Sequence, residues 1–239
     1  MEGFTMSEGL KRPGGEMASR PLHFIWLVDC SGSMMGEKIQ SLNYAIRQTI
    51  PDMKEAAADN PNAQLYVRAI TFSEGACWHI ATPTPVDDFE WIDVEAQGLT
   101  DMGEAFKLVS EQLMMPPMPE RALPPVLVLL SDGQPTDHYE ENLQKLLALP
   151  WGKKAVKIAI AIGQDADEEV LSAFVNNKEM PVLKANNPQA LIKYIKWAST
   201  VAKQVSMPHS KVCGDVSPQT AIDLSTIPQN DTEEDVDVW

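Results

Sequence analysis

Cysteine is scarce in this sequence, with three residues in 239: Cys30, Cys77 and Cys213. Their spacing forms neither a disulfide framework nor a CxxC metal knuckle. This scarcity argues against a disulfide-stapled extracellular domain and is typical of a reducing compartment. Cys30 lies inside a loop motif described below, where we interpret it as a filler residue at a strand end.

The sequence also has no long hydrophobic run and few positively charged residues. Residues 1–20 have no apolar core like that of a signal peptide, and no stretch approaches the roughly 18 apolar residues of a membrane span. We therefore expect a cytoplasmic protein. The sequence has 19 Lys and Arg against 34 Asp and Glu, which gives a net charge of −15. Nucleic acids and anionic membranes need basic patches, so neither is an expected partner.

The remaining composition is that of one globular domain with polar ends. Residues 1–20 mix charged residues with Gly and Pro and are predicted to be a flexible leader. Residues 21–205 are predicted to form the domain. Residues 206–239 are polar and acidic, and we expect this tail to be disordered. The tail is either a solubilising end or a docking peptide with Trp239 as its anchor.

Hydrophobic periodicity in residues 21–205 predicts strands that alternate with helices. Strands are predicted at about 22–29, 65–72, 76–82, 126–130, 155–162 and 181–184. Helices are predicted from Glu37 to a proline stop at Pro51, at about 101–114, 138–148 and 167–177, and from Asn187 onward. This alternation predicts a doubly wound α/β fold with a mostly parallel sheet. The early hairpin adds one antiparallel edge strand.

Oxygen-bearing side chains follow the first predicted strand. The apolar run from Phe24 ends in Asp29, Ser31 and Ser33, and Gly32 allows a tight turn between the two serines. Alternation along an extended loop places both serine hydroxyls on one side. Hard, mostly uncharged oxygen ligands suit Mg²⁺ better than zinc or copper.

Two later segments bring similar side chains to the same edge of the sheet. Thr100 precedes a predicted helix, for which it is also a good N-cap, and Asp132 follows a continuously apolar strand. Ligands of such sheets bind at the carboxyl ends of the strands, near the switch in strand order. Each segment alone is a common turn or cap, but together they predict one Mg²⁺ site, with Mn²⁺ as a substitute. Its open coordination position would accept a carboxylate from another protein.

These motifs together resemble the metal-ion-dependent adhesion site of a von Willebrand factor A domain, and the resemblance spans about 22–204. It implies that Ser31, Ser33 and Thr100 approach the metal, with Asp29 and Asp132 as direct or water-mediated ligands. The family usually presents its threonine after small residues, whereas Leu99 precedes Thr100 in this chain. The resemblance implies a protein-interaction domain that engages partner carboxylates through the metal.

Within that family, the Asp132–Asp137 run is most similar to bacterial tellurium-resistance A domains. These resemble stress-response adaptors encoded with a protein kinase and a phosphatase, which would be the partners. An alternative is a co-chaperone of a hexameric AAA-type ATPase. An extracellular adhesion domain is disfavoured by the missing export signal and disulfides.

Enzymatic alternatives lack essential residues, so we expect no catalytic activity. A Mg²⁺-dependent phosphohydrolase of the haloacid dehalogenase type would place an acid two residues after Asp29, where Ser31 stands. A serine nucleophile at Ser31 or Ser33 would need a paired base. His138 is the only histidine near the motifs, and we interpret it as a loop residue on the surface.

Overall fold

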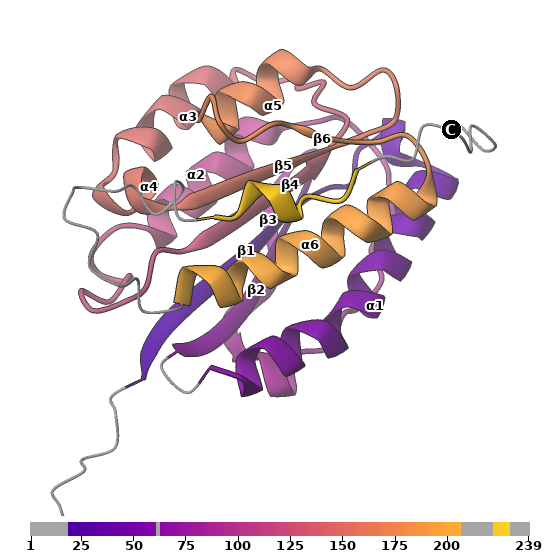
Figure 1. Cartoon of the computed structure of the whole chain (residues 1–239). Coiled ribbons are helices and arrows are strands. Elements are labelled where there is room, and N and C mark those ends of the chain that lie inside the picture. The colour runs from indigo at the N-terminus through magenta and orange to yellow at the C-terminus, as the bar shows by residue number, and fades with distance from the viewer. Residues whose placement is uncertain (1–18, 61–62, 207–221, 230–239) are drawn as a thin grey trace, which may run out of the picture.

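The fold is a six-stranded sheet between two layers of helices (Figure 1), in a computed structural model that describes residues 19–60, 63–206 and 222–229. The strand order is β3-β2-β1-β4-β5-β6. The strands are β1 (Arg20–Asp29), β2 (Ala63–Ser73), β3 (Gly75–Pro85), β4 (Val126–Ser131), β5 (Val156–Ile162) and β6 (Leu183–Ala185). Only β3 pairs antiparallel among these strands, at the edge of the sheet, so the predicted fold class is confirmed.

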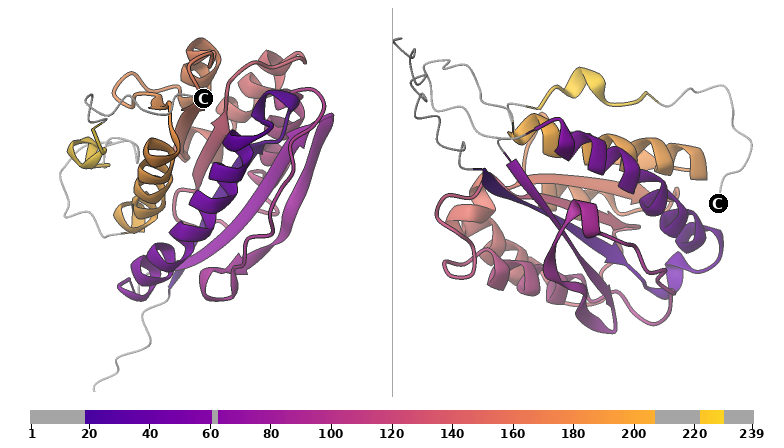
Figure 2. Two further views of the ribbon diagram at one scale, coloured as in Figure 1. Left: turned by 90° about the vertical axis from the view of Figure 1, so that its right-hand side faces the viewer. Right: turned by 90° about the horizontal axis from the view of Figure 1, so that it is seen from below.

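Helices cover both faces of the sheet. The helices are α1 (Glu37–Ala58), α2 (Met102–Gln112), α3 (Tyr139–Ala148), α4 (Pro150–Lys154), α5 (Glu168–Val175) and α6 (Pro188–Ser206). Helices α1 and α6 lie side by side on one face, and α2 and α3 pack together on the other (Figure 2). The rings of Phe106 and Phe174 stack at 5.5 Å and join α2 to α5. Among the described residues, no helix combines the length and apolar character that crossing a membrane requires.

The core follows the apolar runs of the central strands. Every residue of β4 and β5 is buried, as is β1 from Leu22 to Asp29. Strands covered on both faces need such continuous runs, because the side chains on each face pack against a layer of helices. Edge strand β3 has no buried residue. The two strands that end at the candidate site, β1 and β4, are therefore among the most deeply buried parts of the molecule.

Helix α1 corrects the predicted stop at Pro51, because it continues for two more turns to Ala58. Proline leaves one backbone carbonyl of the preceding turn without its helical partner. Contacts beyond the proline compensate for that loss. Met53 is buried in the core, and Asp52 pairs with Lys196 of α6 at 3.3 Å. Tertiary packing thus overrides the local signal.

Part of the tail that we expected to be disordered is folded against α6. Residues Leu224–Thr226 form a short 3₁₀ turn, and Ile222 is buried. The indole N–H of Trp197 donates to Oγ1 of Thr226 at 3.0 Å. The apolar part of this packing comes from a few residues such as Ile222. They are too few to change the polar composition of the tail, from which we predicted disorder. The rest of the predicted tail, 207–221 and 230–239, and residues 1–18 of the predicted leader lie outside the described residues.

Candidate metal site

The five predicted ligands surround the carboxyl ends of the central strands. Asp29 is the last residue of β1, Asp132 follows the end of β4, and Thr100 lies two residues before α2. Strand β1 pairs with β2 on one side and β4 on the other, so the strand order changes direction there. Sheets of this kind bind ligands at such a switch point.

Asp29 organises the loop that follows β1. Its side chain is fully buried, and its Oδ1 accepts a hydrogen bond from the backbone N–H of Ser31 at 2.8 Å. Its Oδ2 accepts the hydroxyl of Ser131 at 2.5 Å. The hydroxyl oxygens of Ser31 and Ser33 lie 2.9 Å apart. The loop therefore places two hydroxyls side by side, as the sequence predicts.

The Thr100 loop is tied to this turn through backbone contacts. The N–H of Gly32 donates to the carbonyl of Gly98 at 3.0 Å. The N–H of Thr100 donates to Oγ1 of Thr136 at 3.0 Å, and the N–H of Thr136 returns a bond to the Thr100 carbonyl at 2.9 Å. These bonds join the three predicted segments into one network.

The predicted role of Thr100 as the N-cap of α2 is wrong. The helix begins at Met102, and Asp101 is its N-cap residue, without a side-chain cap bond. The Asp101 carboxylate instead accepts the N–H of Gly75 at 2.7 Å, which ties the β2–β3 turn to this loop. The long-range bond to Gly75 competes with the local cap that propensity favours.

Asp132 shows that the residues present fit a cation. It is 2% exposed, and its Oδ1 is buried without a hydrogen-bond partner among the described residues. Its Oδ2 lies 4.0 Å from Nζ of Lys38, which is too long for a hydrogen bond. A buried carboxylate oxygen without a partner is costly, and a coordinated cation or its bound water would satisfy it.

Burial also marks Asp29 as an electrostatically costly group. Desolvation raises the pKa of its carboxyl to about 6, against the hydrogen bonds from Ser131 and Ser31, which lower it. The neighbouring charge of Asp132 raises this pKa further. A bound divalent cation would offset the repulsion between the two carboxylates and lower the pKa of Asp29.

The ligand chemistry also favours a hard ion. In the part of the chain that the structure describes, no three His, Cys, Asp or Glu side chains form a cluster able to hold a metal. The candidate site instead combines two carboxylates with three hydroxyls. Such a set of oxygen ligands is suited to a divalent cation.

Two residues that support the site were not assigned a role from sequence. Ser131 donates to Asp29 and accepts the N–H of Gly133 at 2.8 Å, so it connects the ends of β1 and β4. Thr136 anchors the Thr100 loop. Ser131 directly precedes Asp132 and Thr136 lies within the Asp132–Asp137 run, so a hydroxyl directly before that aspartate was the available signal.

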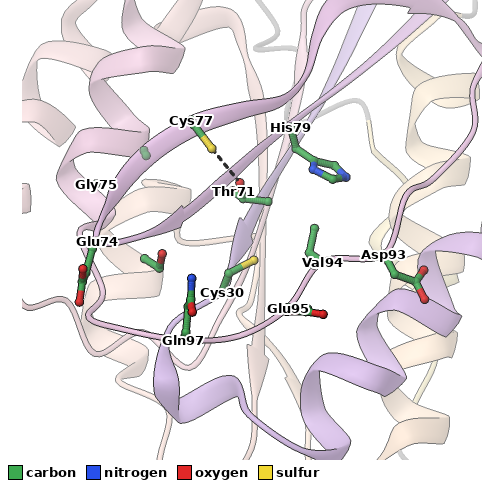
Figure 3. A pocket seen from close by; sticks show the side chains of 12 residues that line it. Cys30, Thr71, Glu74, Gly75, Cys77, His79, Asp93, Val94, Glu95 and Gln97 are labelled. Atoms are coloured by element: carbon green, nitrogen blue, oxygen red, sulfur yellow. Dashed lines mark hydrogen bonds between the residues drawn. The ribbon is translucent and has the colours of Figure 1, made fainter.

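A cavity of about 390 Å³ opens beside the site (Figure 3). Cys30 and Gln97 line it, together with the acidic side chains of Glu74, Asp93 and Glu95. Burial raises the pKa of the Cys30 thiol to about 12, which agrees with an unreactive filler residue. This neighbouring surface is therefore acidic and concave.

Exposed apolar side chains stand on the loops of the site itself. Met35, which follows the serine loop, is 64% exposed, and Leu99, which precedes Thr100, is 54% exposed. Single exposed apolar side chains are common on proteins, but these two flank candidate ligands in the sequence. The site therefore has apolar contacts beside its oxygen ligands.

Comparison with solved structures shows the same fold in proteins of low identity. A von Willebrand factor type A protein from Catenulispora acidiphila is 15% identical with a TM-score of 0.59, over 78% of this chain and 43% of that one. The ArnB paralog VWA2 from Sulfolobus acidocaldarius is 20% identical with a TM-score of 0.55, over 75% and 45%. Proximal thread matrix protein 1 of the mussel byssus, with a zinc-occupied MIDAS motif, is 18% identical with a TM-score of 0.57, over 77% and 48%.

The chain spans less than half the length of each of these three structures. No curated protein matches the sequence. The sequence model of the von Willebrand factor type A domain matches residues 24–196, from the middle of β1 into α6. This match includes all five predicted ligands and every strand of the sheet. The chain belongs to the von Willebrand factor type A domain family.

Proposed function

We propose that this chain is a protein-interaction module that binds a partner carboxylate through a divalent metal. Ser31, Ser33 and Thr100 would hold Mg²⁺ or Mn²⁺ together with Asp29 and Asp132. The observation that carries the proposal is the buried Oδ1 of Asp132, which has no hydrogen-bond partner among the described residues. It belongs to the loop joined through Ser131 to Asp29, next to the paired serine hydroxyls.

Neutral hydroxyl ligands explain why the site would select a carboxylate. A bound Mg²⁺ would act as a Lewis acid that accepts an oxygen ligand from another molecule. Serine and threonine hydroxyls neutralise none of its charge, and Asp29 and Asp132 would leave much of it where they bind through water, so an incoming Asp or Glu would be a strong ligand. The buried network around Asp29 keeps these groups in place before the partner arrives, which lowers the cost of ordering them.

The surrounding surface suggests the chemistry of that partner. Met35 and Leu99 offer apolar contacts on two sides of the site. Glu74, Asp93 and Glu95 line the adjacent cavity and would favour basic groups. We propose a partner segment with one Asp or Glu at the metal, flanked by apolar and basic side chains.

We further propose that the chain is not an enzyme. Ser31 stands where a phosphotransferase of this general layout would need its acid, and His138 is exposed at the start of α3. A generic phosphatase substrate should show no metal-dependent turnover. Turnover that disappears in Asp29→Asn would contradict this part of the proposal.

The resemblance of the Asp132–Asp137 run supports a finer proposal. The module would serve as an adaptor for a co-encoded kinase and phosphatase in a tellurium-resistance-type stress response. Purified kinase and phosphatase encoded beside this chain should bind it with Mg²⁺ and dissociate with EDTA. Mg²⁺-dependent binding to a hexameric AAA-type ATPase instead would favour the co-chaperone alternative.

Calorimetry with Mg²⁺, Mn²⁺ and Zn²⁺ tests the metal directly. Asp29→Ala should abolish binding of Mg²⁺ and Mn²⁺, and Ser33→Ala or Thr100→Ala should weaken it, because each removes one oxygen ligand or its support. Asp88→Ala, which removes an exposed carboxylate from the short turn after β3, is the matched control and should bind normally. Unchanged Mg²⁺ binding in Asp29→Ala would overturn the proposed site.

A further inference from the structure

A second cavity, of about 460 Å³, lies toward the opposite end of the same strands. His23 of β1 and Tyr66 and Arg68 of β2 form its floor. Gln112 at the end of α2 and Pro117 in the following loop also line it. His23 lies roughly 20 Å along β1 from Asp29, at about 3.3 Å per residue. This cavity is therefore separate from the candidate metal site.

Arg68 is a buried cation without a counter-ion in this cavity. It is 5% exposed, and its Nε and Nη1 have no hydrogen-bond partner among the described residues. Its guanidinium lies 3.8 Å from the centre of the Trp78 ring. Among the residues that the structure describes, no Asp or Glu lines the cavity. A ring face offsets only part of the cost of burying a charge, so a negative group is missing.

His23 adds a second unpartnered polar group next to Arg68. It is 6% exposed, and neither ring nitrogen has a hydrogen-bond partner among the described residues. Burial, helped by the charge of Arg68, lowers its pKa to about 4, so the ring is neutral near pH 7. A neutral imidazole offers one donor and one acceptor. His23 and Arg68 thus both line the cavity, and both carry buried nitrogens without a hydrogen-bond partner among the described residues.

The other walls are apolar or weakly polar. The His23 ring stacks on Tyr66 at 5.8 Å, and Pro21, Pro83 and Pro119 contribute further surface. Gln64 and Gln112 are the remaining polar lining groups. A mostly apolar cavity of a few hundred Å³ with a small number of convergent polar groups is typical of small-molecule sites.

We propose that this cavity binds a small organic anion whose carboxylate or phosphate group pairs with Arg68 and whose ring packs against Tyr66 and the prolines. The planar guanidinium donates two parallel hydrogen bonds, a geometry that fits either oxyanion. His23 donates a further hydrogen bond from the side. An uncharged molecule of the same shape would leave the Arg68 charge uncompensated.

Calorimetry on the full chain tests this proposal with benzoate, phenyl phosphate, inorganic phosphate and benzamide at matched ionic strength. Benzoate or phenyl phosphate should bind, and benzamide should not, because it lacks the charge. Phenyl phosphate should bind more tightly than inorganic phosphate, because only the former has a ring for the apolar walls. The preference between benzoate and phenyl phosphate then identifies the natural group as a carboxylate or a phosphate.

Arg68→Met keeps the length of the side chain and removes its charge. It should weaken binding of the preferred probe by about tenfold to a hundredfold, the effect of losing charge-assisted hydrogen bonds. Arg47→Met removes an exposed arginine that pairs with Asp93 on another surface, and it should leave binding unchanged. Mg²⁺ binding, measured on the same samples, should be intact in both variants and shows that they are folded.

Two calorimetric results would overturn the proposal. One is the absence of saturable binding of any probe to the unmodified chain at millimolar concentration. The other is equal binding to the Arg68→Met variant, which would show that the probes bind elsewhere. A crystal structure with the preferred probe should place its oxyanion on Arg68, and density for a side chain of this same chain in that position would also contradict it.

Discussion

Strands β1 and β2 bury charge in two regions, and these differ in how that charge is held. At the carboxyl end of β1, Asp29 receives hydrogen bonds from Ser31 and Ser131, and the Gly98–Thr100 loop is bonded to the same turn through Gly32. Toward the amino end, Arg68 rests on the ring of Trp78, with two of its nitrogens unpartnered. One region is a preorganised polar network, and the other is a cavity with a single strong charge.

This difference teaches what each region is suited to bind. A network with fixed hydrogen bonds presents its oxygens in a defined geometry, which a metal with strict coordination needs. A guanidinium against an aromatic ring selects for the sign of the ligand's charge more than for the ligand's shape. The metal site should therefore be selective for geometry, and the cavity for negative charge.

Separate substitutions at the two ends should have separate effects, and this is the largest difference expected. Asp132→Ala should lower Mg²⁺ affinity by about a hundredfold or more, at least as much as the loss of a supporting residue around a metal. It should leave binding of benzoate or phenyl phosphate unchanged, and Arg68→Met should do the reverse. Calorimetry of both ligands on both variants measures this. A variant that loses both ligands would show that the two regions are coupled or that it is unfolded, which circular dichroism distinguishes.

The dependence of stability on pH should carry contributions of opposite sign from the two regions, because the raised pKa of Asp29 adds stability as the pH falls and the lowered pKa of His23 removes it. The pKa of His23 is about 4 in the folded chain against 6.5 when unfolded, so the unfolded state takes up the proton first as the pH falls. The free energy of unfolding should therefore drop over this window, by about 2 kcal/mol from pH 7 to pH 5 through this group. Urea denaturation at both pH values should show a smaller drop in His23→Phe.

His138→Phe, which removes an exposed histidine, is the matched control for that measurement. If it reduced the acid destabilisation as much as His23→Phe does, burial of His23 would not be the cause. The comparison is best made in EDTA, so that metal binding does not add its own dependence on pH.

Crowding of the Thr100 loop should weaken the metal site without affecting the cavity. Gly98 has φ +76°, and a Cβ there would lie 2.9 Å from Cγ of Glu74. Gly98→Ala should shift this loop and lower Mg²⁺ affinity by about tenfold, through backbone strain and a steric clash. Gly75→Ala imposes similar strain at φ +79° but meets nothing within 4 Å, so it is a matched control. Equal losses in both variants would mean that strain, not the contact with Glu74, sets the position of the loop.

The smallest effect concerns the ring beneath Arg68. A double-mutant cycle with Trp78→Leu and Arg68→Met should give a coupling energy of about 1 kcal/mol in urea denaturation, the usual size of a partly desolvated cation–π contact. A coupling near zero would show that Trp78 only covers the guanidinium. Mg²⁺ affinity should be the same in all four proteins of the cycle.

Much of the fold could be predicted because its signals are local. The strand at 126–130 is continuously apolar, and such a run belongs between two helical layers. The stop at Pro51 failed because contacts of Met53 and Asp52 with distant elements decide the end of α1. Helix α4, a single turn at Pro150–Lys154, was missed because so short an element leaves no periodic pattern.

The candidate site was predictable in part for a similar reason. Asp29, Ser31 and Ser33 lie in one short loop, so their proximity follows from the sequence alone. The bond from Ser131 to Asp29 spans 102 residues, and no local pattern tells which oxygen that hydroxyl meets. Arg68 and His23 sit within strands, and whether a helix, a loop or a cavity covers them depends on the α2–β4 connection. What covers these two side chains can be known only from the assembled fold.

The ladder between β1 and β2 has a mechanical consequence. Ten successive residue pairs, from Arg20 with Ala63 to Asp29 with Phe72, run in parallel register without a bulge. A partner that pulled on the metal loop along the axis of β1 would load these hydrogen bonds in shear, so that many must break together. Tension along that axis would be spread over a strand that is buried from Leu22 to Asp29 before it distorted the loop. A domain built this way should resist extension along β1.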